Sequence, residues 1–321
     1  MKMKIVMLDR NSIGMDIDVN IFEKLGDFEY HNTADPASIK EWIKDAEVII
    51  FNKVKMNEEM LADAPNVKLL CVTATGFDNI DLEYAKKRGI AACNVRDYST
   101  PAVVQHTFAL ALSVLEKIRY YDEYVKSGAY SGQTGFSHFE KTYFELQGKT
   151  WGIIGLGNIG RGVAKVAEAF GCKVIFYSAS GNNTTADYER VDFDTLCAQS
   201  DILSLHCPLS DKTKEIMNLD AFRKMKESAI LVNVARGPVV NEEDLYTALT
   251  EGMIAGAGLD VLCKEPMTLD NPLGKIKDSD KLIITPHMAW ASTEARTRCM
   301  EEVYKNIEAF CQGEKRNRLD V

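Results

Sequence analysis

The stretch WGIIGLGNIG, residues 151–160, decides the fold of this 321-residue chain. A short apolar run leads into Gly155, and Gly157 and Gly160 complete the spacing G-x-G-x-x-G. The first glycine of this pattern permits a tight turn, the second lets the backbone approach a pyrophosphate, and the third lets a helix pack closely on a strand. Because a helical pattern follows directly, the context that the motif requires is present, and the stretch predicts dinucleotide binding.

The helix after this loop is expected to bury one face and to end at Gly171. Apolar residues recur on that face at helical spacing: Val163, Val166, Ala167 and Phe170. The first N–H groups of the helix, around Asn158 and Ile159, would face the phosphates of the nucleotide together with the positive end of the helix dipole.

The residue after the next strand bears on the choice between NAD and NADP. An acidic side chain usually binds the adenosine ribose hydroxyls there, but this chain has Ser178. Serine lacks the charge that would repel a 2′-phosphate, and residues 179–183 carry no Arg or Lys to attract one. NAD is therefore favoured because no cation follows the strand, and NADP stays open.

Short apolar runs alternate with helical patterns along the whole chain, which is typical of α/β folds with parallel sheets. The runs expected to be strands are Ile5–Leu8, Val48–Phe51, Leu69–Thr73, Trp151–Ile154, Val174–Tyr177, Ile202–Leu205, Ile230–Asn233 and Leu282–Thr285. They form two series, one before and one after residue 150. Two domains are expected, residues 1–99 with 291–321 and residues 100–290.

Three further segments complete this organisation. Residues 101–118 predict a helix with Thr100 as N-cap and Pro101 at its first position, apolar nearly all round and thus buried between domains or subunits. Ser127–Phe139 is rich in Gly and Ser and predicts an irregular loop. Residues 292–310 are helical in pattern and are expected to pack back onto the first domain.

Composition narrows the class of protein. The net charge of −9 and pI near 5.2 argue against nucleic acid or anionic membranes as partners. No apolar run approaches the roughly 20 residues of a membrane span, and the N-terminus does not have the pattern of a signal peptide. Eight cysteines without a C-x-x-C pair indicate buried free thiols, a cytoplasmic location and no structural metal site.

Three segments at the ends of expected strands carry candidate catalytic residues, and ligands of open parallel sheets bind at such ends. The segments are residues 233–237, 258–266 and 285–290.

At these residues the chain resembles the D-isomer-specific 2-hydroxy acid dehydrogenase family over almost its whole length. The motifs that carry the resemblance are the loop 155–160, LHCP (205–208), VARG (234–237), GLDV (258–261), Glu265-Pro266, Thr285-Pro286-His287 and TGFDNID (75–81). HMAWAS (287–292) and QHT (105–107) are most similar to glycerate dehydrogenases, also called hydroxypyruvate reductases. The resemblance implies a Rossmann nucleotide-binding domain inserted into a discontinuous flavodoxin-like substrate domain, both doubly wound around parallel sheets.

The resemblance also implies catalytic roles that make chemical sense. Reduction of a ketone by hydride needs a proton donor, and His287 suits this role because histidine titrates nearest neutrality. Glu265 would bond the other imidazole nitrogen and fix its orientation. Arg236 would bind carboxylate and carbonyl oxygens through its planar fork.

The remaining implied site residues bind substrate or cofactor. The backbone N–H groups of Thr75 and Gly76 would grip the substrate carboxylate, and Trp290 would form a wall of the substrate pocket, although packing is the alternative. Asp260 would hold the nicotinamide carboxamide, although a loop cap is the alternative. Further cofactor contacts are expected from His206, Cys207, Pro208, Val234 and Ala235. His206 is expected to pack near the adenine, Cys207 either to line the pocket or to be a plain buried thiol, and His106 is either functional or a core histidine.

The leading hypothesis is a reductase of small 2-keto acids, hydroxypyruvate or glyoxylate, that forms a D-2-hydroxy acid with NAD as cofactor. Longer or aromatic 2-keto acids, and formate or phosphite oxidation, are alternatives on the same architecture. A non-catalytic NAD-sensing protein is a different class, against which the set Arg236, Glu265 and His287 argues, and a methyltransferase would leave these residues without a role. A homodimer is expected.

Overall fold

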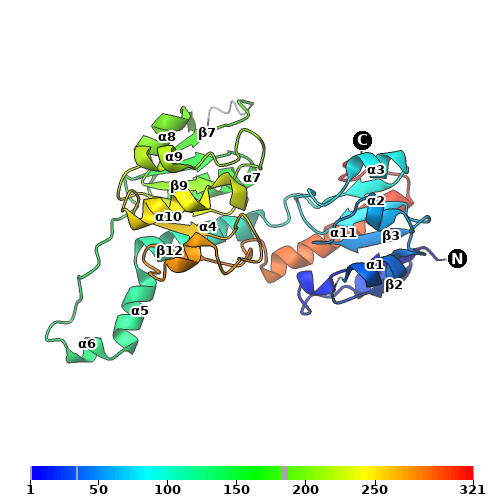
Figure 1. The fold of residues 1–321 in the computed structure, drawn as a ribbon, viewed down its shortest axis with the longest axis horizontal. Helices are drawn as coiled ribbons and strands as arrows, with labels where there is room; N and C mark the ends of the chain where they lie inside the picture. The colour runs from blue at the N-terminus through cyan, green and yellow to red at the C-terminus, as the bar shows by residue number, and fades with distance from the viewer. Residues whose placement is uncertain (1, 34, 183–186, 321) are drawn as a thin grey trace. The chain divides into compact units, whose positions relative to one another are not determined.

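A computed structural model describes residues 2–33, 35–182 and 187–320. Backbone contacts divide the chain into two compact units, and each has its own parallel sheet (Figure 1). Unit 1 comprises Met1–Ser99 and Ala291–Val321, and unit 2 comprises Thr100–Trp290.

Unit 1 is built on a five-stranded parallel sheet in the order β2-β1-β3-β4-β5. This is the flavodoxin-like order of doubly wound folds, as expected. Its strands are β1 (Lys4–Met7), β2 (Asp27–Tyr30), β3 (Val48–Phe51), β4 (Leu69–Val72) and β5 (Ala91–Cys93). Its helices are α1 (Pro36–Ile43), α2 (Glu58–Leu61), α3 (Leu82–Lys87) and α11 (Thr293–Cys311), with 3-10 turns at Arg10–Ser12 and Asn20–Lys24.

The C-terminal helix α11 belongs to unit 1 although it follows unit 2 in the chain. Ser292 is its N-cap and accepts a hydrogen bond from the Ala295 N–H, which satisfies one of the free donors of the first turn. The helix packs against β4. Val303 and Ile307 on its inner face are fully buried, so α11 covers one face of the sheet.

Asp9 lies at the switch point of this sheet, where β1 ends beside β3. Its carboxylate accepts hydrogen bonds from the N–H groups of Asn52 (3.0 Å) and Lys53 (2.7 Å), just beyond β3. The residue is only 8% exposed and adopts a left-handed backbone with φ of 44°. Burial raises the pKa of Asp9 to about 6, because desolvation outweighs these hydrogen bonds.

This carboxyl predicts a pH-dependent term in stability. Because the folded-state pKa lies above the ordinary value of 3.8, the stabilisation is complete below about pH 4 and is lost as pH rises through about 6. Relative to Asp9→Asn, the wild type should lose about 3 kcal/mol of unfolding free energy between about pH 4 and pH 7. Urea unfolding of both proteins at several pH values measures this difference. A difference that does not change with pH would contradict the buried, protonatable carboxyl.

Unit 2 is built on a seven-stranded parallel sheet in the order β12-β11-β10-β9-β6-β7-β8, the Rossmann order with one more strand. Its strands are β6 (Thr150–Ile154), β7 (Lys173–Tyr177), β8 (Glu189–Arg190), β9 (Ile202–Leu205), β10 (Ile230–Asn233), β11 (Gly256–Leu259) and β12 (Leu282–Ile284). Its helices are α4 (Thr100–Leu115), α5 (Ile118–Lys126), α6 (Ala129–Gly132), α7 (Asn158–Ala169), α8 (Phe193–Gln199), α9 (Leu219–Lys224) and α10 (Glu242–Thr250), with 3-10 turns at Gly237–Val239 and Pro272–Lys275.

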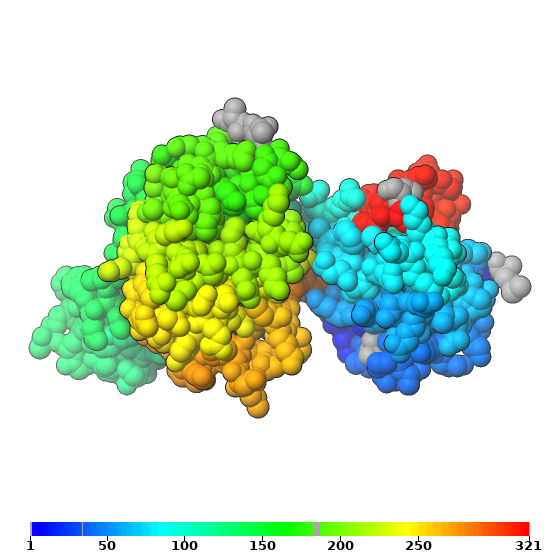
Figure 2. Space-filling view, turned by 45° about the horizontal axis from the view of Figure 1, so that its top comes forward, coloured from blue at the N-terminus to red at the C-terminus, as the bar shows by residue number. Residues whose placement is uncertain are grey.

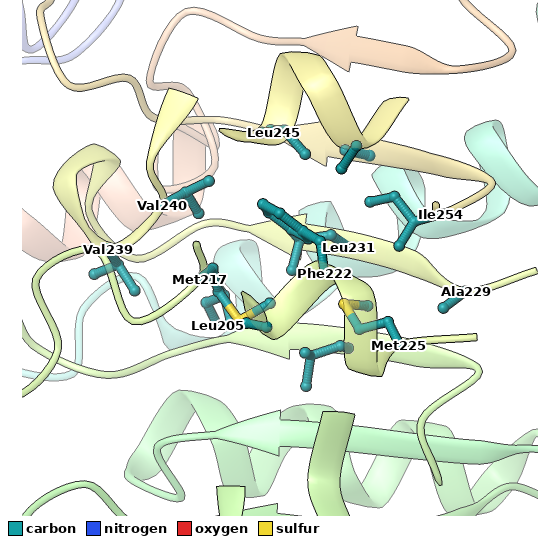
Figure 3. Close-up of a cluster of buried hydrophobic side chains, with 14 of the residues drawn as sticks. Leu205, Met217, Phe222, Met225, Ala229, Leu231, Val239, Val240, Leu245 and Ile254 are labelled. Carbon is teal, nitrogen blue, oxygen red and sulfur yellow. The ribbon is translucent and has the colours of Figure 1, made fainter. Parts of the chain in front are cut away.

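One face of this sheet is covered by α9 and α10. Leu205 of β9 and Leu231 of β10 are fully buried against Phe222 of α9 and Leu245 of α10. Figure 3 shows these side chains converging between the sheet and the two helices. The cluster fixes the strand ends that carry the residues of the site.

The opposite face is covered by α4 and α7. The predicted burial of α4 is thus achieved within unit 2, against α7, β10 and β11. The helix differs from the expected residues 101–118 at both ends. Thr100 is its first residue, not its N-cap, and the helix ends at Leu115, because Lys117 takes a left-handed backbone with φ of 55°.

A second helix, α5, begins at Ile118 and starts an arm that protrudes from the body of unit 2 (Figures 1 and 2). The arm comprises residues 118–145. The expected loop Ser127–Phe139 lies in it, but the loop contains the short helix α6 at Ala129–Gly132. Regular structure was wrongly excluded there because this single helical turn begins after Gly128 and itself ends in a glycine, Gly132.

Two smaller predictions need correction. Phe170 is not on the buried face of α7, since it is 41% exposed and stacks on Phe108 instead. The helix ends at Ala169, and Gly171 follows with φ of 79°, as expected for a C-terminal stop. All eight cysteines are free, but Cys263 and Cys311 are exposed, so buried thiols were predicted correctly only for the other six.

No described helix is both long enough and apolar enough to cross a membrane. Among the same residues, no group of three His, Cys, Asp or Glu side chains could hold a metal ion.

Candidate active site

The glycine loop between β6 and α7 is packed as tightly as its sequence predicts. A Cβ on Gly155 would lie 2.8 Å from the Cα of Cys207, and the residue has φ of 93°. A Cβ on Gly160 would lie 2.2 Å from the carbonyl oxygen of Gly155. A Cβ on Gly157, in contrast, would meet no described atom within 4 Å. The loop is therefore closed toward the protein and open at Gly157.

The start of α7 suits an anionic ligand. Gly157 is the N-cap and supplies no side-chain acceptor to the first turn. Gly157 and Asn158 are exposed, and Ile159 is half-buried. Because the N–H groups of a helix start attract phosphate, this end of α7 fits the pyrophosphate of a dinucleotide. These residues would hold it, as the sequence predicts.

The loop predicts a contrast between two alanine variants. Gly157→Ala fills the open side, so it should weaken NADH binding about tenfold or more while leaving the melting temperature nearly unchanged. Gly160→Ala forces α7 away from the loop, so it should lower both cofactor affinity and thermal stability. Calorimetric titration with NADH and thermal unfolding separate the two effects. Equal stability losses in both variants would contradict the geometry of the loop.

Ser178 lies directly after β7, where the ribose is expected. It is 7% exposed, and its hydroxyl lies 3.5 Å from that of Ser180. Residues 179–183 contain no Arg or Lys, as noted from the sequence, but a cation reaches this loop from farther along the chain. The Arg190 guanidinium donates a hydrogen bond to the Gly181 carbonyl at 3.2 Å, because β8 pairs in parallel with β7 and ends beside it.

The segment after β9 packs against the glycine loop. His206 Nε2 lies 3.0 Å from the Ser204 hydroxyl, and its Nδ1 is buried with no partner among the described residues. Burial lowers the pKa of His206 to about 3, so the ring is neutral, in keeping with a packing role. Cys207 is 5% exposed, and burial raises its pKa to about 11, so it is an unreactive thiol. The carbonyl of Pro208 accepts a hydrogen bond from Thr213.

The sheet order brings the expected catalytic segments together. Because β10, β11 and β12 are adjacent and parallel, Arg236, Asp260 and His287 follow neighbouring strand ends. The backbone confirms this adjacency. The Asp260 N–H donates to the Asn233 carbonyl, and the His287 N–H donates to the Asp260 carbonyl, at 2.9 and 2.8 Å.

His287 and Glu265 form a direct pair. Nδ1 of His287 lies 2.7 Å from Oε2 of Glu265, and the other carboxylate oxygen accepts the Leu262 N–H at 2.9 Å. The side chains are 29% and 34% exposed. With Nδ1 bonded to a carboxylate that is itself fixed, the Nε2 edge of the ring is the one that can meet a substrate. His287 also has φ of 53°, a left-handed backbone that a histidine rarely adopts.

Asp260 holds this unusual backbone in place. Its Oδ1 accepts the Thr285 hydroxyl (2.6 Å) and the Met288 N–H (2.8 Å), and its Oδ2 accepts the Ala289 N–H (2.8 Å). The side chain is only 1% exposed. This geometry supports the loop-capping alternative for Asp260, and the nicotinamide role stays a prediction.

His106 extends the network from α4. Its Nε2 lies 2.9 Å from the Thr285 hydroxyl and 3.5 Å from Oδ1 of Asp260. The sequence left His106 between a functional and a core residue, and it gave Thr285 no role of its own although it lies in a quoted motif. The only available signal was Thr285 preceding Pro286 at a strand end, because the helix α4 that supplies His106 is far away in the chain.

Arg236 and the residues before it are held by backbone contacts. Nη1 of Arg236 donates to the Ala235 carbonyl at 2.8 Å, and its side chain is half-buried. Ala235 is buried and donates its N–H to Asn233, which fixes the turn after β10, and Val234 beside it is half-buried. Trp290 donates its indole N–H to the His287 carbonyl at 3.0 Å, so it supports the histidine loop. A pocket-wall role for Trp290 stays a prediction.

The expected substrate loop lies in unit 1, after β4. The Thr75 hydroxyl donates to the Val95 carbonyl at 2.9 Å, and the Thr75 carbonyl accepts from Asn94 at 2.8 Å. These bonds fix the loop with Thr75 exposed and Gly76 half-buried. Within the described residues, neither backbone N–H has an acceptor among the hydrogen bonds of the chain, so both can donate to a carboxylate.

Comparison with known proteins agrees with this geometry. The family model "D-isomer specific 2-hydroxyacid dehydrogenase, NAD binding domain" matches residues 108–289, more than half of the chain. A hydroxypyruvate reductase of Blautia hydrogenotrophica is 37% identical over 97% of this chain and 98% of its own. A glycerate dehydrogenase of Methylorubrum extorquens is 38% identical over 100% of both chains.

A solved structure is similar over nearly the whole length of this chain. The D-lactate dehydrogenase of Aquifex aeolicus, complexed with NAD and lactic acid, has a TM-score of 0.86 and 30% identity over 99% of both chains. Identity at this level over nearly full length indicates common descent and not only a shared fold. The chain therefore belongs to the D-isomer specific 2-hydroxyacid dehydrogenase family, and unit 2 carries the NAD-binding domain of that family.

Proposed function

We propose that the protein reduces a small 2-keto acid, hydroxypyruvate or glyoxylate, to the D-2-hydroxy acid with NAD(P)H. The single observation that carries this proposal is the 2.7 Å pair of His287 and Glu265, which follow β12 and β11, beside the end of β10 that leads to Arg236. The names of the two relatives, hydroxypyruvate reductase and glycerate dehydrogenase, support the small substrate.

The reaction needs one hydride and one proton for each carbonyl. NAD(P)H supplies the hydride when bound at the start of α7. His287 supplies the proton from Nε2 to the carbonyl oxygen, and the bond that Glu265 makes to Nδ1 stabilises the ring while it carries the proton. The products are the hydroxy acid and NAD(P)⁺, and His287 regains its proton from solvent.

Two further groups would orient the substrate. The guanidinium of Arg236 matches both the carboxylate and the carbonyl oxygen, so it would hold the carbonyl polarised. The free N–H groups of Thr75 and Gly76 would bind the carboxylate from unit 1.

The test follows the absorbance of NADH and of NADPH as substrates are added. Hydroxypyruvate, glyoxylate, pyruvate, 2-ketoisocaproate and phenylpyruvate cover the competing hypotheses. Fast oxidation with hydroxypyruvate or glyoxylate is expected. Faster oxidation with the branched or aromatic acids would keep the mechanism but refute the small substrate. Cofactor binding without turnover of any acid would refute the enzyme and favour an NAD-sensing protein.

We also propose that two copies pair through the arm, residues 118–145, and not chiefly through α4. Helix α5 has no buried residue, although Ile118, Tyr121 and Val125 follow one face at helical spacing. Farther along, Phe136 and Phe139 are 91% and 82% exposed. A second copy is the occupant that would cover such an apolar surface symmetrically.

Sedimentation of the wild type and of Phe136→Ser/Phe139→Ser tests this pairing. A dimer is expected for the wild type and a larger monomer fraction for the variant. Leu269→Ser is the matched control, because Leu269 is fully exposed in unit 2 but lies outside the arm. A monomeric wild type, or a variant that remains as dimeric as the control, would refute the proposal.

We also propose that the protein is located in the cytoplasm. All eight cysteines are free, and six are buried, which suits a reducing compartment. Cell fractionation with antibody detection tests it, and recovery from an oxidising compartment would refute it.

A further inference from the structure

The loop after β7 gathers hydroxyl and cationic groups at the position of the adenosine ribose, and we propose that this chain binds NADPH in preference to NADH. The inference rests on the proposed function, because it concerns the cofactor of that same site. Its residues are Ser178, Ser180, Gly181, Arg190 and Arg161.

The first step is that no carboxylate follows β7 to bind the ribose hydroxyls. Ser178 occupies that position, and the Ser180 hydroxyl lies 3.5 Å from it. Both hydroxyls can donate to phosphate oxygens, and neither repels them. The first two carboxylates that follow in the sequence are in ion pairs, since Asp187 binds Arg161 at 3.1 Å and Glu189 binds Lys173 at 2.8 Å.

The second step is the placement of Arg190. Residue 190 pairs with Phe176 in the parallel ladder of β7 and β8, so its side chain starts near the end of β7. The guanidinium reaches Gly181, where Nη1 donates to the carbonyl at 3.2 Å and Nη2 lies 3.8 Å from the position that a Cβ would take. Arg190 is exposed, so it can turn its planar fork to a phosphate.

The third step concerns the carboxylate of Asp187, which a second cation neutralises. Arg161 belongs to the first turn of α7, where its N–H donates to the Gly157 carbonyl. Its guanidinium donates a hydrogen bond to Asp187. Asp187 lies just before β8, the two-residue strand that ends at Arg190. Arg190 is thus the cation at the loop itself, and Arg161 neutralises the carboxylate that precedes β8. A 2′-phosphate can form charge-assisted hydrogen bonds with Arg190, whereas the 2′-hydroxyl of NADH offers no such charge.

Calorimetric titration tests the proposal without any need for turnover. The wild type, Arg190→Gln and Arg190→Lys are titrated with NADPH, NADH, 2′,5′-ADP and 5′-AMP. We expect the wild type to bind NADPH and 2′,5′-ADP about tenfold or more tighter than the ligands without the 2′-phosphate. Arg190→Gln should remove about tenfold of that preference and leave NADH and 5′-AMP unchanged, and Arg190→Lys should retain part of it.

Two further variants sharpen the result. Arg223→Gln is the matched control, because Arg223 is an exposed arginine of unit 2 on α9, paired with Asp220. It should leave all four affinities unchanged. Ser178→Asp should weaken NADPH far more than NADH, because it places a negative charge beside the 2′-phosphate.

Results that would contradict the NADPH preference differ from the result that would contradict the proposed function. Equal weakening of NADPH and NADH by Arg190→Gln would show that Arg190 only supports the loop, and would overturn the inference. A wild type that prefers NADH would also overturn it, while turnover with NADH would leave the proposed function standing. Failure to bind either cofactor would refute the proposed function itself.

Discussion

Replacement of His287 by alanine should lower kcat by about 10²–10⁴-fold, which is the usual contribution of a positioned acid or base. The imidazole is the proton donor of the proposed reaction, and alanine leaves no donor in its place. The affinity for NADH should barely change, because the glycine loop and α7 are untouched. Steady-state kinetics with hydroxypyruvate and a separate cofactor titration measure both quantities.

The loop that carries His287 needs its own control. Met288→Ala changes the next residue, whose side chain is 47% exposed and whose N–H still bonds to Asp260. It should retain nearly full kcat. If His287→Ala retained near-normal turnover, or if Met288→Ala lost as much, His287 would not be the proton donor.

The charge of Glu265, which is paired with His287, matters for the proton transfer. Glu265→Gln would keep a hydrogen-bonding group at that position but would remove the charge that stabilises a protonated ring. The structure explains why this carboxylate is in position, since the Leu262 N–H holds its second oxygen. The family's motifs predicted the pair, because the resemblance implies the roles of both residues. They did not predict the bond from Leu262, which depends on the local turn.

Most strands were predictable from short apolar runs, since strands buried on both faces have such runs. β9 and β10 coincide with the expected residues, whereas β11 was not among the named apolar runs, although residues 258–266 were expected to follow a strand. Its sequence, GAGL, has two glycines because α4 packs directly on this strand and leaves no room for larger side chains. A Cβ on Gly256 or Gly258 would lie 2.6 or 2.8 Å from side-chain atoms of Val114 or Leu110. That requirement comes from a helix more than 130 residues away in the chain, so local hydrophobicity could not reveal it.

The edge strand β8 was missed for a different reason. It has two residues, Glu189 and Arg190, both exposed, so it has no hydrophobic signal. Its pairing with β7 nevertheless brings Arg190 to the ribose loop. The choice of cofactor was therefore argued from residues 179–183 alone, where no cation exists. A residue type at a site can be read from the sequence, but a neighbour supplied by a paired strand requires the fold.

The contacts of Asp260 also depend on the fold and were not predictable from the sequence. Substitution of Asp260 should lower both stability and kcat. Asp260→Asn offers one acceptor oxygen where the carboxylate offers two, so its amide N–H₂ must face the Ala289 N–H or the donors from Thr285 and Met288. A buried donor left unsatisfied costs about 1–3 kcal/mol, and thermal unfolding should show this loss. Because the His287 backbone is then free to leave its left-handed conformation, kcat should fall about 10²-fold, as a misplaced group implies.

Asp220→Asn is the matched control, since Asp220 is an exposed residue of unit 2 whose ion pair with Arg223 lies on the surface. Its stability should change by less than about 1 kcal/mol. The alternative role of Asp260 predicts another pattern. If the carboxylate served only to bind the nicotinamide, Asp260→Asn would weaken NADH binding while leaving the melting temperature unchanged. A lower melting temperature together with lower kcat would instead identify Asp260 as the residue that positions His287, because only the loop contacts link it to both quantities.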